Sequence, residues 1–178
     1  MASQRFSRST WIDLGLSELR EVGPPALTID HLCGKADKTR GSFYFHFESI
    51  ENYLTALAWE WHDQFTSQVI SASQTNTSRL DLLNTLAVRL DLNLEAGIRQ
   101  LALVNDAVSE VVTDVDRERV SWLAKLYQNS GKYNADQATA LARIEYAAFT
   151  GFKLVEPDMT PAEAREIYSA FLEFTDRA

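Results

Sequence analysis

Residues 37–47 read Asp-Lys-Thr-Arg-Gly-Ser-Phe-Tyr-Phe-His-Phe, and this stretch decides the fold that the sequence predicts. Cations and hydrogen-bond donors lie next to aromatic rings throughout it. If the stretch is helical, Phe43 and Phe47 are one turn apart and can pack on neighbouring helices. Arg40 and Tyr44 then offer polar groups from the same helix. An apolar anchor and a set of polar side chains therefore share one short helix.

Two amphipathic helices are predicted before this stretch. The first covers residues 5–22, with Ser9 or Thr10 as its N-cap. The second follows Thr28 and stops at Ala36. A threonine hydroxyl can accept a hydrogen bond from a free amide at a helix start, so Thr28 is a natural N-cap.

Only Asp37 and Lys38 separate the second helix from the predicted third one. A connection this short joins the two helices of a helix-turn-helix motif. Aspartate also tolerates the left-handed backbone that such a turn often needs. We therefore expect a three-helix head with a helix-turn-helix.

The rest of the chain repeats the helical period and shows no β-alternation. Six further helices are predicted, over residues 49–70, 80–94, 98–112, 114–131, 134–156 and from 160 onward. The expected fold class is all-α, with the three-helix head followed by a six-helix bundle.

Charge divides the chain near residue 48. The net charge is −8 over 178 residues, which alone argues against a polyanionic partner. Residues 1–47 hold six Lys or Arg against five Asp or Glu, whereas residues 48–178 hold eleven against twenty. The acidic character belongs to the bundle, so we expect two domains, 1–48 and 49–178.

Several protein classes are disfavoured. The single cysteine, Cys33, excludes an internal disulfide and a cysteine-based zinc site. His31, His46 and His62 are too dispersed for a metal site, and no catalytic motif or cofactor-binding loop is present. No apolar run is long enough for a membrane span and no signal peptide is evident, so we expect a cytoplasmic protein that is not an enzyme.

Residues 9–62 resemble the DNA-binding head of the TetR family (TetR/AcrR type) of bacterial transcriptional regulators. The resemblance depends on the helix end at Gly23, on Thr28 and Ala36, and above all on the run Gly-Ser-Phe-Tyr-x-His-Phe from Gly41. It implies a DNA-binding domain over 1–48 and an effector-binding and dimerisation domain over 49–178. It also implies a homodimer that binds a palindromic operator in double-stranded DNA, usually as a repressor, and that a small-molecule effector releases.

The predicted DNA-binding residues lie in and around the turn. They are Thr28, Lys38, Thr39, Arg40, Gly41, Ser42, Phe43, Tyr44 and His46. Arginine can read guanine through two hydrogen bonds, and Thr or Ser can reach a base or a phosphate. Gly41 allows close approach, and Tyr44 and His46 are expected at phosphates. Alternatively the charges are ordinary solvated surface, as for most short basic motifs.

One departure from the family pattern concerns the start of the fourth helix. Ile50 stands where the family often has a lysine that holds a phosphate, and Glu48 and Glu51 lie beside it. We therefore expect weaker DNA binding than in a relative with that lysine.

Two further sets of residues are candidates for effector and partner. Trp61, Phe65, Asn105, Trp122, Tyr146 and Phe149 could line an effector pocket, or be ordinary core. A buried Asn105 would bind an effector or bond to another helix. The predicted dimer interface comprises Ala140, Ile144, Ala147, Gly151, Tyr168, Phe171 and Leu172. Packing within one chain is the alternative.

The function that the sequence favours is a ligand-responsive DNA-binding regulator. The principal alternative is a helical ligand-binding or scaffolding protein whose head has lost specific DNA binding. A helical-bundle enzyme is a distant third.

Overall fold

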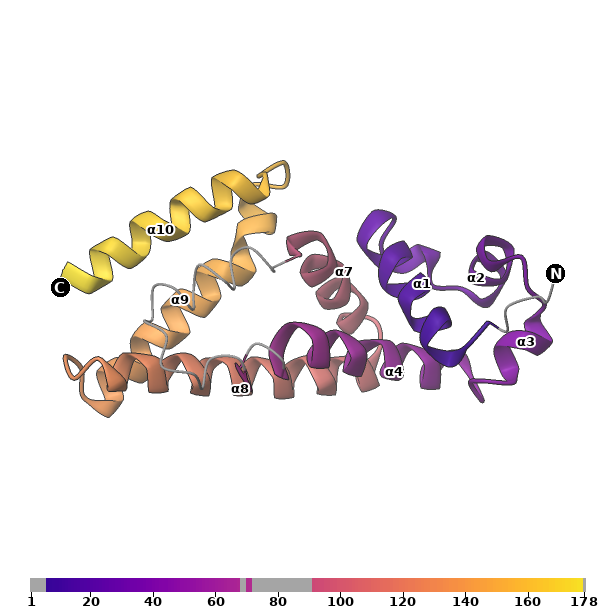
Figure 1. Cartoon of the computed structure of the whole chain (residues 1–178), viewed down its shortest axis with the longest axis horizontal. Coiled ribbons are helices and arrows are strands. Elements are labelled where there is room, and N and C mark those ends of the chain that lie inside the picture. The colour runs from indigo at the N-terminus through magenta and orange to yellow at the C-terminus, as the bar shows by residue number, and fades with distance from the viewer. Residues whose placement is uncertain (1–5, 68–69, 72–90, 178) are drawn as a thin grey trace. The chain divides into compact units, whose positions relative to one another are not determined.

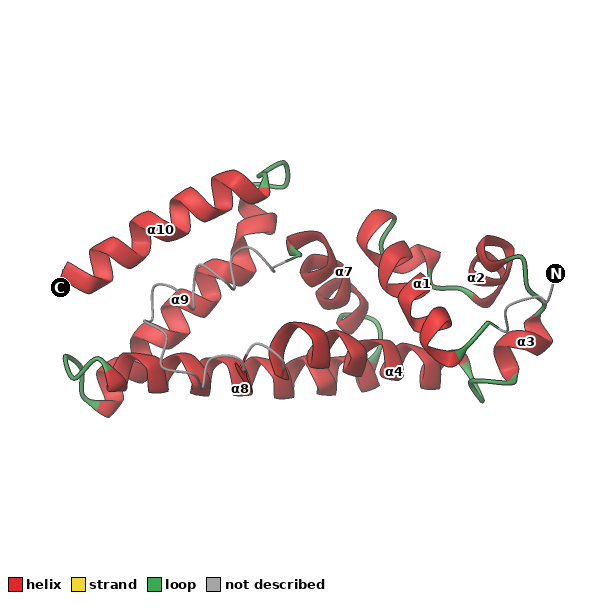
Figure 2. Cartoon of the chain, viewed as in Figure 1, coloured by secondary structure: helices red, strands yellow, loops and turns green. Residues whose placement is uncertain are grey.

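The computed structural model describes residues 6–67, 70–71 and 91–177, and every regular element among them is helical (Figures 1 and 2). The predicted all-α class is confirmed. The α-helices are α1 (Arg8–Glu21), α2 (Ile29–Ala36), α3 (Arg40–Tyr44), α4 (Ile50–His62), α7 (Leu92–Ala102), α8 (Asp106–Asn129), α9 (Ala135–Val155) and α10 (Pro161–Arg177). A 3-10 turn, η1 (Pro24–Ala26), and a π-helical turn, η2 (Asp63–Ser67), complete them. None of the described helices has the length and apolar character that crossing a membrane requires.

The described residues form two compact units. The first contains the residues up to Asp63 together with Ala96–Thr113, and the second contains those of Gln64–Glu95 and Asp114–Ala178. These compact units do not divide at residue 48, where the sequence predicts a boundary between a DNA-binding and an effector-binding domain. That functional boundary stays a prediction.

In the first unit, α1 packs against α4 and α2, and α2 packs against α3. The apolar stripes predicted on these helices meet in one core. Its fully buried large side chains include Trp11, Leu32, Phe43, Tyr53 and Leu57. Burial of these side chains holds α3 against the other helices. A short helix needs such packing because its own hydrogen bonds are too few to keep it stable.

Helix starts follow the predicted capping pattern with one exception. The hydroxyls of Thr28 and Ser49 accept hydrogen bonds from the third residue beyond them, at 3.3 Å and 3.2 Å. The predicted cap at Thr28 is confirmed, and Ser49 caps α4. The expected cap of α1 at Ser9 or Thr10 is wrong. Ser7 caps that helix by accepting from the Thr10 amide at 3.1 Å.

The predicted helix division in the middle of the chain is also wrong. We expected one helix over 98–112 and another from 114, but α7 ends at Ala102 and α8 runs unbroken from Asp106 to Asn129. Asn105 causes the restart, because its side-chain oxygen accepts the Val108 amide at 3.0 Å. It is a half-buried N-cap and not the buried amide in mid-helix that the apolar stripe suggested.

In the second unit, α8, α9 and α10 share a core around Tyr127, Ala138, Ala142 and Leu172. Asn134 and Gln137 form a reciprocal capping box at the start of α9, where the sequence predicts a helix start. The helix predicted over 80–94 lies mostly outside the described residues. The helix predicted to reach Ile70 ends as α4 at His62 and continues as η2.

Gly15 marks a close approach between α1 and α4. A Cβ at this position would lie 1.9 Å from the Tyr53 hydroxyl oxygen and 2.5 Å from Leu57 Cδ1. Gly15→Ala should therefore destabilise the protein by about 1–3 kcal/mol through overpacking. Gly34→Ala is the matched control: Gly34 is exposed and its Cβ would meet nothing within 4 Å, so the change should stabilise α2 by about 1 kcal/mol. Urea unfolding measures both, and shifts of the same sign would contradict this packing.

Candidate DNA-binding site

The connection between α2 and α3 is a left-handed turn at Asp37. Its backbone has φ 51° and ψ 48°, as the sequence predicted for this aspartate. The turn lets the Lys38 amide donate to the carbonyl of Cys33 at 3.0 Å, which closes the end of α2. Thr39 then starts α3, its hydroxyl accepting from the Ser42 amide at 3.2 Å. The two helices thus form the predicted helix-turn-helix.

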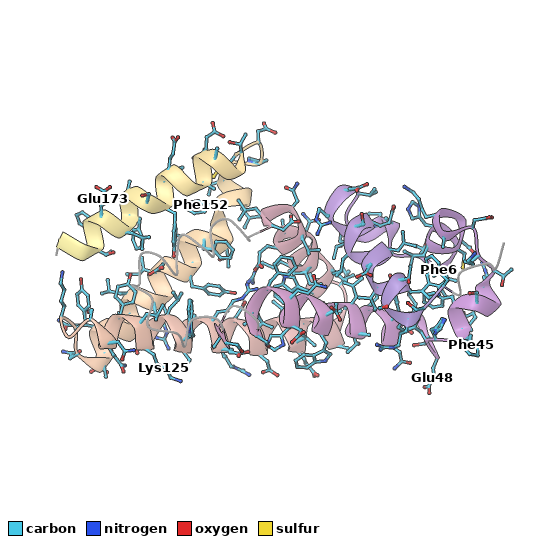
Figure 3. The ribbon with its side chains drawn as sticks, viewed as in Figure 1. Phe6, Phe45, Glu48, Lys125, Phe152 and Glu173 are labelled. Atoms are coloured by element: carbon cyan, nitrogen blue, oxygen red, sulfur yellow. The ribbon has the colours of Figure 1, made fainter. Side chains whose placement is uncertain are left out.

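Phe43 anchors α3 in the core of the first unit. Its ring contacts those of Trp11, Phe47 and Tyr53, with centroids 5.4, 5.3 and 5.2 Å apart. Its side chain is completely buried, so the prediction that Phe43 belongs to the DNA-binding surface is wrong. Phe45, which we did not select, is 75% exposed and lies at the outer edge of this unit (Figure 3).

The remaining predicted residues surround this anchor on the surface. Thr28, Thr39, Arg40, Gly41 and Tyr44 are exposed, whereas Lys38, Ser42 and His46 are half-buried. Thr28 and Thr39 use a hydroxyl lone pair as helix caps. Each still has an O–H that can donate, because a hydroxyl is a donor as well as an acceptor.

Arg40 is held by a carboxylate of the preceding helix. Its Nε donates to Asp30 Oδ1 at 2.7 Å and its Nη2 to Asp30 Oδ2 at 2.6 Å. These bonds favour the charged guanidinium, so they raise the pKa of Arg40 above its ordinary value. The predicted base-reading arginine therefore already has a fixed orientation.

His46 has a partner on the N-terminal side of α1. Its Nε2 donates to the carbonyl oxygen of Phe6 at 2.9 Å. A neutral imidazole with hydrogen on Nε2 has none on Nδ1. His46 can therefore donate to a phosphate from Nδ1 only when both ring nitrogens carry hydrogen. The phosphate contact predicted for His46 depends on that form of the ring.

A buried carboxylate that the sequence did not single out ties α1 to α2. Glu18 is buried, and its oxygens accept from His31 Nε2 at 2.5 Å and from Lys35 Nζ at 3.0 Å. The hydrogen bond from His31, with the charge of Lys35, lowers the pKa of Glu18 although burial opposes this. Glu18 follows the buried Gly15 by three positions, so helical spacing places it on the apolar face of α1. That position was the sequence signal for a buried carboxylate, and we did not use it.

The lowered pKa of Glu18 predicts acid sensitivity. A carboxylate whose pKa is lower folded than unfolded stabilises the fold above its unfolded pKa, and this contribution disappears as the pH falls toward the folded pKa. Stability should therefore fall as the pH drops below the ordinary value of 4.5, and Glu18→Gln should remove part of that fall. Urea unfolding at several pH values tests this. Glu21→Gln, an exposed change on the same helix, should keep the wild-type profile, and an unaltered profile in Glu18→Gln would contradict the account.

The predicted effector residues are divided between the two units. Trp61 and Asn105 belong to the first unit, whereas Phe65, Trp122, Tyr146 and Phe149 belong to the second. Tyr146 and Phe149 stack with centroids 6.2 Å apart, and Trp122 packs against the same core. The second unit therefore brings at least three predicted aromatics together, while Asn105 is occupied as a helix cap.

A buried polar cluster in the second unit, which we call the Arg119 network, was not predicted. Arg119 Nη1 donates to both oxygens of Glu95 at 3.1 and 3.0 Å and to the Tyr146 hydroxyl at 3.3 Å. Its Nε donates to Thr66 Oγ1 at 2.9 Å. Tyr146 in turn donates to Asp116 Oδ1 at 2.6 Å. The network thus connects η2, α7, α8 and α9 within this unit.

The predicted dimer residues divide into an exposed set and a buried set. Ala140, Ile144 and Ala147 are exposed on α9, and Gly151 is half-buried. On α10, Leu172 is buried in the core of its own chain, and Tyr168 and Phe171 pack against that core. Leu172 is therefore not part of an exposed interface. Among the described residues of α10, Ile167 and Phe174 are exposed large apolar side chains.

Several solved structures with a similar arrangement of helices are described as regulators of transcription. A TetR regulator from Legionella pneumophila has a TM-score of 0.76 and 16% identity, covering 97% of this chain and 99% of its own. A regulator from Aquifex aeolicus has a TM-score of 0.73 and 17% identity, covering 94% and 98%. A protein described as a transcriptional regulator from Saccharomonospora viridis, solved in complex with choline, has a TM-score of 0.74 and 13% identity, covering 96% and 97%. No protein-family model and no curated protein sequence matches the chain. The chain has the fold of the TetR/AcrR transcriptional regulators.

Proposed function

We propose that this chain is a ligand-responsive, DNA-binding transcriptional regulator of the TetR/AcrR family. The observation that carries the proposal is the α2–turn–α3 unit. Phe43 holds α3 in the core, while Thr39, Arg40 and Tyr44 stay exposed beside a turn closed by left-handed Asp37. A helix-turn-helix binds DNA by placing the start of its second helix in the major groove.

The exposed residues and the half-buried Lys38 then each contact a defined part of the DNA. Arg40 reads a guanine, since its guanidinium matches the two acceptors of that base in the major groove. Thr39 donates to a base or a phosphate through its free O–H. Tyr44 donates to a phosphate, and Lys38 sends its amine to another. Thr28 extends this surface at the start of α2.

The proposed assembly is a homodimer in the cytoplasm on a palindromic operator. Ala140, Ile144 and Ala147 give α9 an exposed face of small and apolar side chains, and Ile167 and Phe174 do the same for α10. A second copy of the chain would cover these faces. Two heads related by a two-fold axis would then bind half-sites about one helical turn of DNA apart.

The proposed effector is a small molecule bound in the second unit near Trp122, Tyr146 and Phe149. An effector changes DNA affinity only if it binds the two conformations of the regulator with different affinity. Tyr146 contacts Arg119, which donates to Thr66 in the turn that continues α4. A displacement of Tyr146 would therefore shift Arg119, and Arg119 would in turn shift Thr66 in this turn. We propose repression that the effector relieves.

Selection from a random pool of duplex DNA tests this function. The proposal expects enrichment of a palindrome whose half-sites contain a guanine. If no sequence is enriched, the alternative of a helical ligand-binding or scaffolding protein replaces it. The alternative draws support from the acidic balance and from Glu48 and Glu51, which are exposed on either side of Ile50.

Ile50 gives a quantitative prediction for DNA binding. It lies half-buried at the first position of α4, where a lysine could bury its stem and send its amine to a phosphate. Ile50→Lys should tighten binding to the enriched duplex by about threefold to tenfold through one added phosphate contact. Ile50→Gln, which adds length without charge, should change it little. Fluorescence anisotropy at fixed salt measures both, and unchanged affinity in Ile50→Lys would refute this account.

A further inference from the structure

Asp30 and Arg40 form an exposed ion pair on the surface of the head. Asp30 is in the first turn of α2 and Arg40 is the first residue of α3. Arg40 Nε donates to Asp30 Oδ1 at 2.7 Å and Nη2 donates to Oδ2 at 2.6 Å, while Nη2 also lies 2.5 Å from Oδ1. Fork-to-fork pairing of this kind fixes the plane of the guanidinium as well as its position.

The pairing leaves the outer end of the guanidinium available. An arginine has five N–H donors in a planar fork. Asp30 takes one hydrogen from Nε and one from Nη2, which lie along one side of the group. One hydrogen of Nη2 and both of Nη1 remain, and the terminal pair from Nη1 and Nη2 matches guanine N7 and O6. Asp30 can therefore hold Arg40 while Arg40 reads a base.

A contribution of this pair to folding is a poor explanation of its geometry. The Arg40 and Asp30 side chains are 65% and 70% exposed, and exposed ion pairs add little to stability because water screens them. On the proposed function, a carboxylate close to DNA would also repel phosphates, so Asp30 would weaken binding to every sequence alike. The benefit must lie in something other than stability or general affinity.

We propose that Asp30 is a positioning residue that orients Arg40 toward a guanine of each operator half-site. This inference rests on the proposed function. Without Asp30, Arg40 samples several rotamers, and ordering it on DNA costs conformational entropy. Asp30 therefore lowers the affinity for DNA of any sequence and raises the preference for guanine.

The test combines a protein change with a base change. Three proteins are compared: wild type, Asp30→Ala and Asp30→Asn. Each is titrated with the enriched duplex, with a copy in which 7-deazaguanine replaces the guanine of each half-site, and with a scrambled duplex. The modified base lacks the N7 acceptor. Wild type should lose about tenfold in affinity on the modified duplex and Asp30→Ala only about twofold to threefold. Asp30→Asn should be intermediate, since it removes the negative charge and replaces one accepting oxygen with an NH2 group that can only donate.

General affinity should change in the opposite direction. Asp30→Ala should bind the scrambled duplex more tightly than wild type, because a negative charge near the phosphates is removed. A loss of structure would weaken both duplexes together and would lower the unfolding midpoint, which Asp30→Ala should leave unchanged. Asp13→Ala, which removes an exposed carboxylate from α1, is the charge control and should keep the wild-type response to the modified base.

The outcomes separate this inference from the proposed function. Equal loss on the modified duplex in wild type and Asp30→Ala would overturn the positioning role while leaving DNA binding intact. In another outcome, Asp30→Ala binds the enriched duplex more tightly than wild type and still loses the full affinity on the modified duplex. That result would show that Asp30 holds Arg40 back from the base, and it would also overturn the positioning role. Failure of the wild type to enrich any sequence would overturn both.

Discussion

Phe43→Ala is expected to destabilise the protein by about 3–5 kcal/mol, the usual cost of removing a buried phenylalanine. Phe43 is completely buried against Trp11, Phe47 and Tyr53, and α3 has only five residues. A helix this short depends on its tertiary contacts. The substitution should therefore release α3 and also abolish binding to the enriched duplex. Urea unfolding with an anisotropy titration measures both effects.

Phe45 provides the matched control two residues away. It is 75% exposed, so Phe45→Ala should change stability by no more than about 0.5 kcal/mol. Similar losses in the two variants would contradict the assignment of Phe43 as the anchor of α3.

Arg119→Met is expected to destabilise the protein by about 3–5 kcal/mol, because it leaves the carboxylate of Glu95 buried without its cation. Arg119 and Glu95 are both buried, and their atoms approach to 3.0 Å. Replacing both partners, as Arg119→Met with Glu95→Leu, should recover most of that loss, since no buried charge then remains unpaired. Thermal or urea unfolding of the two single variants and the double variant gives the coupling energy.

Arg117 is the control for this buried pair. It lies two positions before Arg119 on α8 and pairs with Asp114, but the two side chains are 74% and 63% exposed. Arg117→Met should therefore cost less than about 1 kcal/mol. A double variant as unstable as Arg119→Met would contradict the role of the buried charge pair.

The local structure of the head was predictable because its signals are short-range. Thr28 and Ser49 cap their helices through hydroxyls that reach only three residues ahead. Asp37 takes the left-handed conformation that few non-glycine residues tolerate. Local signals also failed where several were adjacent: Ser7, Ser9 and Thr10 are all plausible caps, and Ser7 is the one that caps α1.

Polar residues inside apolar stripes were missed for a different reason. Arg119 lies four positions after Val115 and four before Leu123, so helical spacing places it on the buried face of α8. Its neighbours Asp116, Arg117 and Glu118 made this segment look like solvated surface. The buried carboxylates of Glu18 and Glu145 were also missed. Their partners come from other helices, and one sequence does not reveal such distant pairings.

Glu145 shows what the sequence alone could not supply. It is buried on α9, where Tyr127 of α8 donates to its Oε2 at 2.6 Å and Tyr168 of α10 donates to its Oε1. Burying a carboxylate is tolerable only with such donors. Tyr168 was predicted at a dimer interface because its partner within the chain was unknown.

The break between α7 and α8 also escaped sequence analysis. Ile98, Leu101, Val108 and Val112 keep a helical period across it, and periodicity alone does not register a short interruption. Leu103 and Val104 are highly exposed in the connection. Asn105 restarts the helix through its side chain, so the polar residue in the stripe was itself the signal for a new helix.

The most direct test of the central claim is the affinity of the full chain for its enriched duplex as salt increases. Wild type should bind that duplex at least about a thousandfold more tightly than a scrambled one, with affinity falling steeply with salt as phosphate contacts release counterions. Arg40→Ala should reduce the preference for the enriched sequence while keeping salt-dependent binding. Equal affinity of wild type for the enriched and scrambled duplexes at every salt concentration would contradict the account.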